Sequence, residues 1–247
     1  MRILAIAISV LISACAALPG AQSANLRPSV DWVANSPEWA QEAKNVFASA
    51  TAHIESVAKT RADARWAVVL DLDETVLNNI DYQVSLDLAG AEYTPETWDI
   101  WVAEEAATLV PGAASFINAV NQNGGHVVFI TNRRDTHQLA TENALAALGI
   151  KRHQDFRVLL TRASPLAGRA KQARFDAVPT LLTIQGYPSV EVIAYIGDTI
   201  GDKPSLPGAW SFFCINQGGM YGEPCARRLP HHPESAKRHH SPVNQGG

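Results

Sequence analysis

The stretch that decides the fold is Trp66-Ala67-Val68-Val69-Leu70-Asp71-Leu72-Asp73-Glu74-Thr75, or WAVVLDLDET. Its first five residues are a continuous apolar run, which is typical of a strand buried on both faces of a parallel sheet. Acidic and hydroxyl side chains begin directly after this run, where such a strand ends. Because parallel sheets place function at the carboxyl ends of their strands, the stretch predicts both a sheet and a site beside it.

Further strands and helices alternate along the chain, and their spacing predicts a mostly parallel sheet. We expect strands at residues 126–131, 156–161, 190–196 and 210–215, and helices at 111–121, 138–148 and 167–178. The fold class is therefore α/β, with a Rossmann-like, mostly parallel sheet and helices on both faces. Residues 36–60, which open on the helix-capping run Ser36-Pro37-Glu38, and residues 80–110 are expected to form a small helical domain.

Composition excludes several classes of protein. The chain has 247 residues, of which 47% are hydrophobic and 18% charged, so it can bury a substantial core and is neither a disordered chain nor a coiled coil. Its formal net charge of −4 leaves no basic surplus for binding a nucleic acid polymer. Three cysteines are too few for a disulfide framework.

Residues 1–14 are expected to be an export signal. Arg2 precedes an apolar run from Ile3 to Ala14, and twelve helical residues reach about 18 Å, too short for a hydrocarbon core of about 30 Å. The run ends in Ile12-Ser13-Ala14-Cys15, which resembles the bacterial lipobox and implies an outer-membrane lipoprotein anchored through lipid on Cys15. Residues 15–35 would then be a tether. The alternatives are ordinary cleavage, for example after Ala24, which gives a periplasmic protein, and a misassigned start codon.

Two cysteines remain if Cys15 is lipidated, namely Cys214 and Cys225. They either form a bridge, which an oxidising compartment favours and which would contribute about 3 kcal/mol, or stay as reduced thiols that never approach. We favour the bridge. Residues 226–247 are polar and rich in His, Arg and Pro, which predicts a disordered tail. Residues 36–225 are left as the globular domain.

Three acidic residues are expected at the carboxyl edge of the sheet. Asp71 and Asp73 follow the strand at 66–70 and share one side of it, and Asp198 follows the strand at 190–196. At about 5 Å and an effective dielectric of about 20, two carboxylates repel by about 3 kcal/mol, so the pair needs a cation or must hold a proton. Three converging acids offer only oxygen ligands, which favours a hard cation such as Mg²⁺ over zinc.

Thr131 and Lys171 add a hydroxyl and an ammonium group to this edge. Acids, a hard cation, a hydroxyl and a lysine suit phosphoryl transfer, in which positioning and charge neutralisation do most of the work. Arg133 reads either as a surface charge or as a partner of the phosphate, and the sequence leaves both interpretations open.

Four motifs in this order, DLDET, TNR, a lysine and GDxxxD, resemble those of the haloacid dehalogenase (HAD) superfamily of phosphohydrolases. The surrounding sequence is similar to one branch, the class C (subfamily IIIB) bacterial acid phosphatases, many of which are surface lipoproteins. Segments that carry this second resemblance are WDIWV at 98–102, VPGA at 110–113, KQAR at 171–174 and MYG at 220–222. The resemblance covers roughly residues 36–225.

The resemblance implies catalytic roles for four residues. Asp71 would be the nucleophile that forms an aspartyl-phosphate. Asp73 would be the general acid that protonates the leaving oxygen, and then the base that activates water. Thr131 would hydrogen-bond the transferring phosphoryl group, and Lys171 would neutralise it.

It also implies a metal site and further substrate contacts. Asp71 and Asp198 would hold Mg²⁺ together with the backbone carbonyl of Asp73, and Asp202 would either bind the metal or orient its waters. Class C members often have two adjacent acids at the end of the fourth motif, where this chain has one acid, Asp202, after Gly201. Substrate contacts are expected from Thr131 and Lys171, and also from Asn132 and Tyr221.

The sequence thus predicts an exported Mg²⁺-dependent acid phosphatase that hydrolyses phosphomonoesters, with nucleoside monophosphates among its candidate substrates. One alternative is a phosphotransferase that passes the phosphoryl group to organic alcohols with the same residues. Another is a non-catalytic haem- or metal-binding lipoprotein that uses the His-rich tail. The resemblance also allows a homodimer, since related proteins can dimerise.

Overall fold

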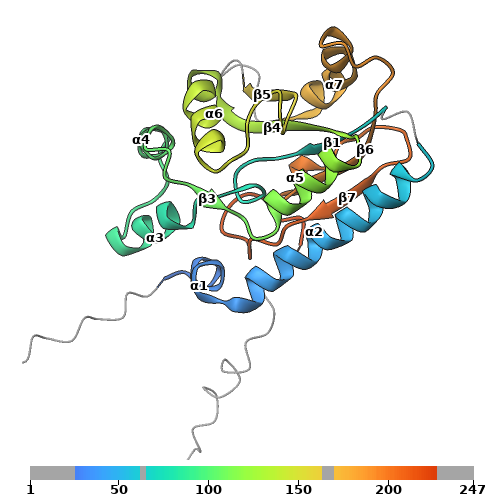
Figure 1. The fold of residues 1–247 in the computed structure, drawn as a ribbon. Helices are drawn as coiled ribbons and strands as arrows, with labels where there is room; N and C mark the ends of the chain where they lie inside the picture. Colours follow the sequence, from blue (N-terminus) through green and yellow to red (C-terminus); the bar gives the residue numbers. More distant parts are fainter. Residues whose placement is uncertain (1–25, 62–64, 163–169, 227–247) are drawn as a thin grey trace, which may run out of the picture.

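The computed structural model describes residues 26–61, 65–162 and 170–226, and its centre is a five-stranded parallel sheet (Figure 1). The strands stand in the order β5-β4-β1-β6-β7. Their bounds are β1 Trp66–Leu70, β4 His126–Arg134, β5 Val158–Arg162, β6 Glu191–Gly197 and β7 Ser211–Cys214. The predicted α/β fold is confirmed. β4 continues beyond the predicted end at residue 131, so the TNR motif lies within the end of the strand rather than after it.

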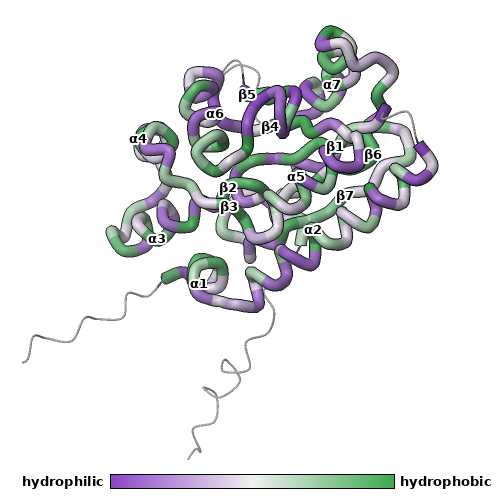
Figure 2. Tube along the Cα trace, in the orientation of Figure 1, coloured by the Kyte–Doolittle hydropathy of each residue, from purple (hydrophilic) through white to green (hydrophobic). Residues whose placement is uncertain are grey.

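Helices cover both faces of the sheet, as predicted. The face that carries Val68 and Leu70 packs against α2 (Pro37–Ala58), α5 (Ala113–Gln122) and α6 (Gln138–Ala147). The other face, which carries Val69, packs against α7 (Gln172–Ile184) (Figure 1). This division follows from the alternation of side chains along β1. Figure 2 shows hydrophobic residues along the central strands, as expected of a sheet covered on both sides.

The long helix α2 belongs to the core. It begins after Ser36, whose hydroxyl accepts a hydrogen bond from the backbone N–H of Trp39 at 3.4 Å. Its buried side chains, which include Phe47 and Ile54, recur at helical spacing and face α5, β6 and β7. Residues 37–58 therefore form one layer of the core and not, as predicted, part of a separate small helical domain.

A short helix precedes α2. α1 (Pro28–Asn35) buries Val30, Trp32 and Val33 and packs against α3. Just before it, Arg27 Nε lies 2.6 Å from Asp87 Oδ1. The prediction of a tether over 15–35 is thus wrong for the residues of α1, because their apolar face is long enough to join the core.

Residues 77–110 are an insertion between β1 and α5. β2 (Leu77–Asn78) and β3 (Thr108–Leu109) pair antiparallel, and α3 (Ile80–Ala89) and α4 (Pro95–Ala103) lie between them in the chain (Figure 1). α4 contacts α6 and the short helix η1 (Asp135–His137), which directly follows β4. The insertion therefore reaches the carboxyl edge of the sheet.

Among the described residues, no helix combines the length and the apolar character that crossing a bilayer requires. The predicted signal at 1–14, the lipidation site at Cys15 and the tail residues 227–247 lie outside the described residues.

Candidate active site

The ends of β1 and β6 bring three carboxylates together. Asp71 follows β1, Asp198 follows β6, and Asp202 lies in the short helix η3 (Ile200–Asp202). One carboxylate oxygen from each residue lies within 4.8 Å of the others. All three residues are buried, at 8%, 2% and 5% exposed respectively. The structure thus places three of the four residues predicted to bind metal in one acidic cluster.

Lys171 reaches this cluster from the N-terminus of α7. Its Nζ pairs with Asp71 and lies 2.6 Å from Asp202 Oδ1. Burial lowers the pKa of Lys171, but the two carboxylates outweigh this effect and raise the pKa to about 12. Lys171 is therefore a fixed positive charge that faces the predicted nucleophile.

The two carboxyl groups that Lys171 contacts differ in their environments. Burial raises the pKa of Asp71 to about 7, against the attraction of Lys171. Burial also acts on Asp202, but Lys171 and hydrogen bonds from Thr199 lower its pKa below the usual value. Thr199 donates to Asp202 Oδ2 from its N–H and its hydroxyl, at 2.9 and 2.7 Å. Asp202 also sits against Gly197, where a Cβ would come within 2.2 Å of Asp202 Cβ.

The acidic cluster fits a hard divalent cation. Oδ2 of Asp198 is buried, and no group in the described part of the chain hydrogen-bonds to it. Burial, followed by repulsion from Asp202 and Asp71, raises the pKa of Asp198 well above its usual value. Three buried carboxylates opposed by a single ammonium group leave negative charge that a cation such as Mg²⁺ would neutralise. Asp71, Asp198 and Asp202 are the side chains that would hold it.

Asp73 points its carboxylate toward other partners. Its Oδ1 accepts hydrogen bonds from Arg133 Nη2 at 2.8 Å and from Asn79 Nδ2 at 3.0 Å. The hydroxyl of Thr131 lies 3.4 Å from Asp73 Oδ2. Because its side chain is 2% exposed, Arg133 is not a surface charge. It is the buried ion-pair partner of Asp73.

The TNR motif is fixed by the chain around it. The N–H of Arg133 donates to the buried Thr131 hydroxyl at 3.1 Å. Arg174 on α7 donates to the Thr131 carbonyl and, at 2.6 Å, to Asn132 Oδ1. Asn132 is exposed and lines the cavity of the site, whereas Thr131 presents its hydroxyl beside Asp73.

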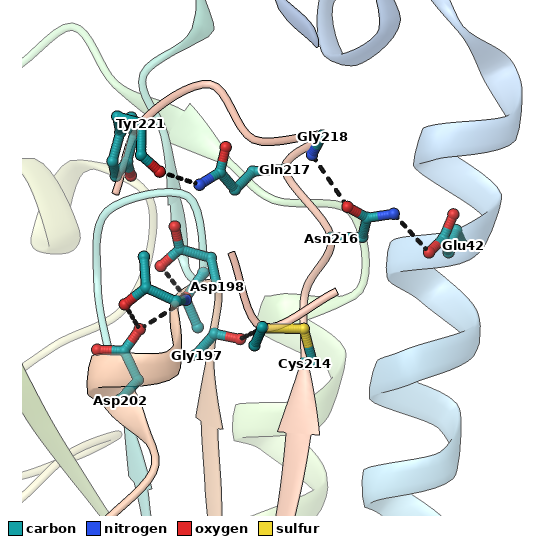
Figure 3. The surroundings of a disulfide bond; sticks show 12 residues. Glu42, Gly197, Asp198, Asp202, Cys214, Asn216, Gln217, Gly218 and Tyr221 are labelled. Carbon is teal, nitrogen blue, oxygen red and sulfur yellow. Dashed lines mark hydrogen bonds between the residues drawn. A yellow bond between two sulfur atoms is a disulfide. The ribbon is translucent and has the colours of Figure 1, made fainter. Parts of the chain in front are cut away.

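A disulfide between Cys214 and Cys225 closes the loop that carries Tyr221, and this confirms the favoured alternative for the two thiols (Figure 3). The N–H of Cys225 donates to the carbonyl of Asp198 at 3.3 Å, so the bridge lies beside the acidic cluster. Gln217 closes the loop internally by donating to the carbonyl of Tyr221 at 2.7 Å (Figure 3).

Tyr221 links this loop to the first motif. Its hydroxyl donates to Glu74 Oε2 and lies 3.4 Å from the backbone oxygen of Asp73. Burial, and then repulsion from Asp73, raise the pKa of Glu74 to about 7. Sequence reasoning assigned no role to Glu74, although its place inside the acidic motif was an available signal. Asn79 was also missed, because it belongs to no motif.

One cavity of about 880 Å³ is lined by most of these residues: Asp71, Asp73, Glu74, Asn132, Arg133, Lys171, Asp198, Asp202 and Tyr221. Thr131 and Asn79 are fully buried and lie behind its wall. The insertion contributes Trp98, whose ring centre lies 5.7 Å from the guanidinium carbon of Arg133 and which packs edge-on against Tyr82. Tyr93 also lines the cavity. The cavity exceeds the size of a phosphoryl group, so it has room for an organic group beside the carboxylates.

Residues 14–204 match the family model described as HAD superfamily, subfamily IIIB (acid phosphatase). The chain belongs to this family, and the protein is a phosphomonoesterase. The resemblance that the four motifs carry is thereby confirmed.

Two solved structures share its fold. One is a class C acid phosphatase from Bacillus anthracis, with 23% identity, a TM-score of 0.61 and coverage of 71% of this chain and 69% of that one. The other is the class C acid phosphatase from Bacillus anthracis with tungstate bound, with 20% identity, a TM-score of 0.65 and coverage of 78% of this chain and 84% of that one.

Proposed function

We propose that the protein is an exported, Mg²⁺-dependent phosphomonoesterase that works through an aspartyl-phosphate intermediate on Asp71. The observation that carries this proposal is the position of Asp71 on the wall of the cavity, paired with the ammonium of Lys171 and with carboxylate oxygens of Asp198 and Asp202 within 4.8 Å. An anionic nucleophile approaches a phosphate only where positive charge offsets their repulsion. Lys171 supplies part of that positive charge. A Mg²⁺ ion bound by the acidic cluster would supply the rest.

In the first step a carboxylate oxygen of Asp71 attacks the phosphorus atom, and the bond from phosphorus to the leaving oxygen breaks. Asp73 gives its proton to that oxygen, so the alcohol leaves as a neutral molecule. Lys171 neutralises charge on the phosphoryl group and steadies Asp71, with which it is paired. The Thr131 hydroxyl, which lies 3.4 Å from Asp73 Oδ2, is proposed to hydrogen-bond the transferring group.

In the second step Asp73, now a carboxylate, takes a proton from water while the water oxygen attacks the phosphorus atom. The bond from phosphorus to the Asp71 oxygen breaks, inorganic phosphate leaves, and Asp73 is protonated again. Every group has then returned to its starting state. Mg²⁺, when bound, supplies electrostatic stabilisation of the phosphoryl oxygens.

Nucleoside monophosphates are the proposed substrate class. Support comes from the cavity, which has room for an organic group and is lined by the aromatic rings of Tyr93, Trp98 and Tyr221. Flat aromatic surfaces favour stacking against a planar ring. Asn132 lines the same cavity and is available to a substrate.

Export and lipid anchoring at Cys15 are proposed from the sequence of residues 1–15. The disulfide between Cys214 and Cys225 supports export, because such bonds persist in oxidising compartments. Labelling of producing cells with a radioactive fatty acid tests the anchor. Label should appear on the wild-type protein and be absent from Cys15→Ala.

The enzymatic proposal is tested by measuring phosphate release from 4-nitrophenyl phosphate with Mg²⁺ and with EDTA. We expect turnover that requires Mg²⁺ and that falls by at least about 10³-fold in Asp71→Asn. Acid quenching with radioactive substrate should trap label on the wild-type protein and not on the variant. Asp176→Asn, on the exposed face of α7, is the matched control and should keep its activity. An active Asp71→Asn would refute the proposed nucleophile.

A further inference from the structure

We propose that Arg133 is a positioning residue for proton transfer: with Asn79, it holds Asp73 by one carboxylate oxygen and leaves the other to exchange the proton with the leaving group. The proposal rests on the proposed function, since it takes Asp73 as the general acid. It adds two residues that act through Asp73 without reacting themselves.

The two oxygens of Asp73 have different surroundings. Oδ1 accepts hydrogen bonds from Arg133 Nη2 at 2.8 Å, from Arg133 Nε at 3.0 Å and from Asn79 Nδ2 at 3.0 Å. Oδ2 has longer contacts, with Arg133 Nε at 3.3 Å and the Thr131 hydroxyl at 3.4 Å. Three short donors occupy Oδ1, so Oδ2 is the oxygen that carries the transferable proton.

Arg133 is itself held from several directions. Its Nη1 donates to Thr141 Oγ1 on α6 at 3.3 Å, and its N–H donates to Thr131 at 3.1 Å. The ring of Trp98 on α4 covers the guanidinium, with 5.7 Å between the guanidinium carbon and the ring centre. A planar guanidinium that is fixed in this way presents its N–H donors to Asp73 in one set geometry, which the flexible ammonium group of a lysine does not.

Asn79 is the second residue that holds Asp73 Oδ1. It is fully buried, and its Oδ1 accepts a hydrogen bond from Trp101 Nε1 at 2.9 Å. The indole N–H can only donate, so it fixes which end of the amide faces Asp73. The 77–110 insertion therefore helps to hold both residues, since Trp98 covers Arg133 and Trp101 donates to Asn79.

Arg133 has little capacity left for a substrate. Nε and Nη2 face Asp73, Nη1 faces Thr141, and the side chain is 2% exposed. A role in binding would require these contacts to break. The effect of Arg133 on the reaction is therefore expected through Asp73.

The test compares kcat/KM for phenyl phosphate and 4-nitrophenyl phosphate, which are similar in shape and differ in how strongly the leaving oxygen needs a proton. kcat/KM covers the steps up to alcohol release, so hydrolysis of the aspartyl-phosphate does not mask the effect. General acid catalysis contributes about 10²- to 10⁴-fold, so in Arg133→Lys we expect a loss of about 30-fold on phenyl phosphate and under about 3-fold on 4-nitrophenyl phosphate. Arg152→Lys, which alters an exposed ion pair with Glu142, should change neither value.

Two further variants keep the test decisive. Asp73→Asn provides the reference and should show the same selectivity with a larger loss. Asn79→Ala should lose about 3- to 10-fold on phenyl phosphate selectively, and it carries the test if Arg133→Lys does not fold. Equal losses on both substrates in Arg133→Lys and Asn79→Ala, beside a selective Asp73→Asn, would overturn the positioning role alone. An unselective Asp73→Asn would overturn the acid role in the proposed function, and the inference with it.

Discussion

Asp71 and Asp73 belong to one short motif, yet they pair with different cations: Asp71 with Lys171 and Asp73 with Arg133. Two carboxylates this close in the chain would repel if both faced the same space. The fold separates them by pointing one toward the acidic cluster and α7 and the other toward β4 and the insertion. Each acid therefore has a positive partner of its own, as the different roles proposed for the two residues require.

Lys171→Met should weaken both stability and activity. Removing one partner of a buried ion pair leaves uncompensated charge, which typically costs about 3–5 kcal/mol of unfolding free energy. Activity should fall by at least about 10²-fold, because positive charge beside Asp71, the proposed nucleophile, is lost. Thermal unfolding in EDTA measures the first effect, and Mg²⁺ should restore part of the lost stability by replacing the missing charge.

The exposed Lys203→Met is the matched control for this lysine. It should change neither the unfolding temperature nor the rate. Equal behaviour of the two variants would show that the Lys171 ion pairs contribute nothing to the site.

The sequence was sufficient to predict the site residues that directly follow strands. The apolar run at 66–70 predicted β1 with its bounds, and the alternation of elements predicted the sheet, so Asp71 and Asp198 could be placed at one edge. Lys171 was predicted as an ammonium group for an anionic substrate, and Asp202 was predicted as a metal ligand through the family resemblance. The structure places both beside Asp71.

The parts that sequence reasoning missed depend on tertiary contacts. The turn over residues 72–77 brings Asn79 beside Asp73, and Trp101 from the far side of the insertion orients its amide; no sequence motif marks either contact. Arg133 could not be assigned because its burial depends on Trp98 and Thr141, which belong to two other elements. α1 was read as tether because an eight-residue helix has too few apolar positions to stand out.

Glu74→Gln should change how stability depends on pH. Folded Glu74 has its pKa raised from 4.5 to about 7, chiefly by burial, so the folded protein binds the proton more tightly than the unfolded chain. Its contribution to unfolding free energy therefore falls as the pH rises from about 4.5 to about 7. Glutamine has the same shape and does not titrate. The variant should thus gain about 3 kcal/mol over the wild type across this window.

Urea unfolding in EDTA at both ends of the window measures this difference. The exposed Glu96→Gln controls for the change in formal charge. A constant difference between Glu74→Gln and the wild type across the window would refute the burial effect.

Reduction of the disulfide should loosen the loop that carries Tyr221. Opening the bridge between Cys214 and Cys225 removes a short closed loop, which we expect to lower the unfolding free energy by about 2–3 kcal/mol. Loss of restraint on Tyr221 and on the Asp198 backbone should also lower kcat/KM. Unfolding and kinetics with and without a reductant measure both effects. The double variant Cys214→Ala/Cys225→Ala should resemble the reduced protein and be insensitive to reductant, and a response of this variant would assign the effect elsewhere.

Gly197→Ala should weaken metal binding without removing any ligand. A Cβ at this position would come within 2.2 Å of Asp202 Cβ, a distance that cannot exist, so Asp202 must leave the position in which it pairs with Lys171 and joins the acidic cluster. Disturbing groups that orient metal ligands commonly costs about 10- to 100-fold in affinity, and we expect the Mg²⁺ concentration for half-maximal activity to rise by about tenfold or more. Gly201→Ala is the matched control, because its Cβ would meet only the Thr199 hydroxyl at an ordinary 3.7 Å. The same Mg²⁺ requirement in both variants would show that the contact between Gly197 and Asp202 does not set the metal site.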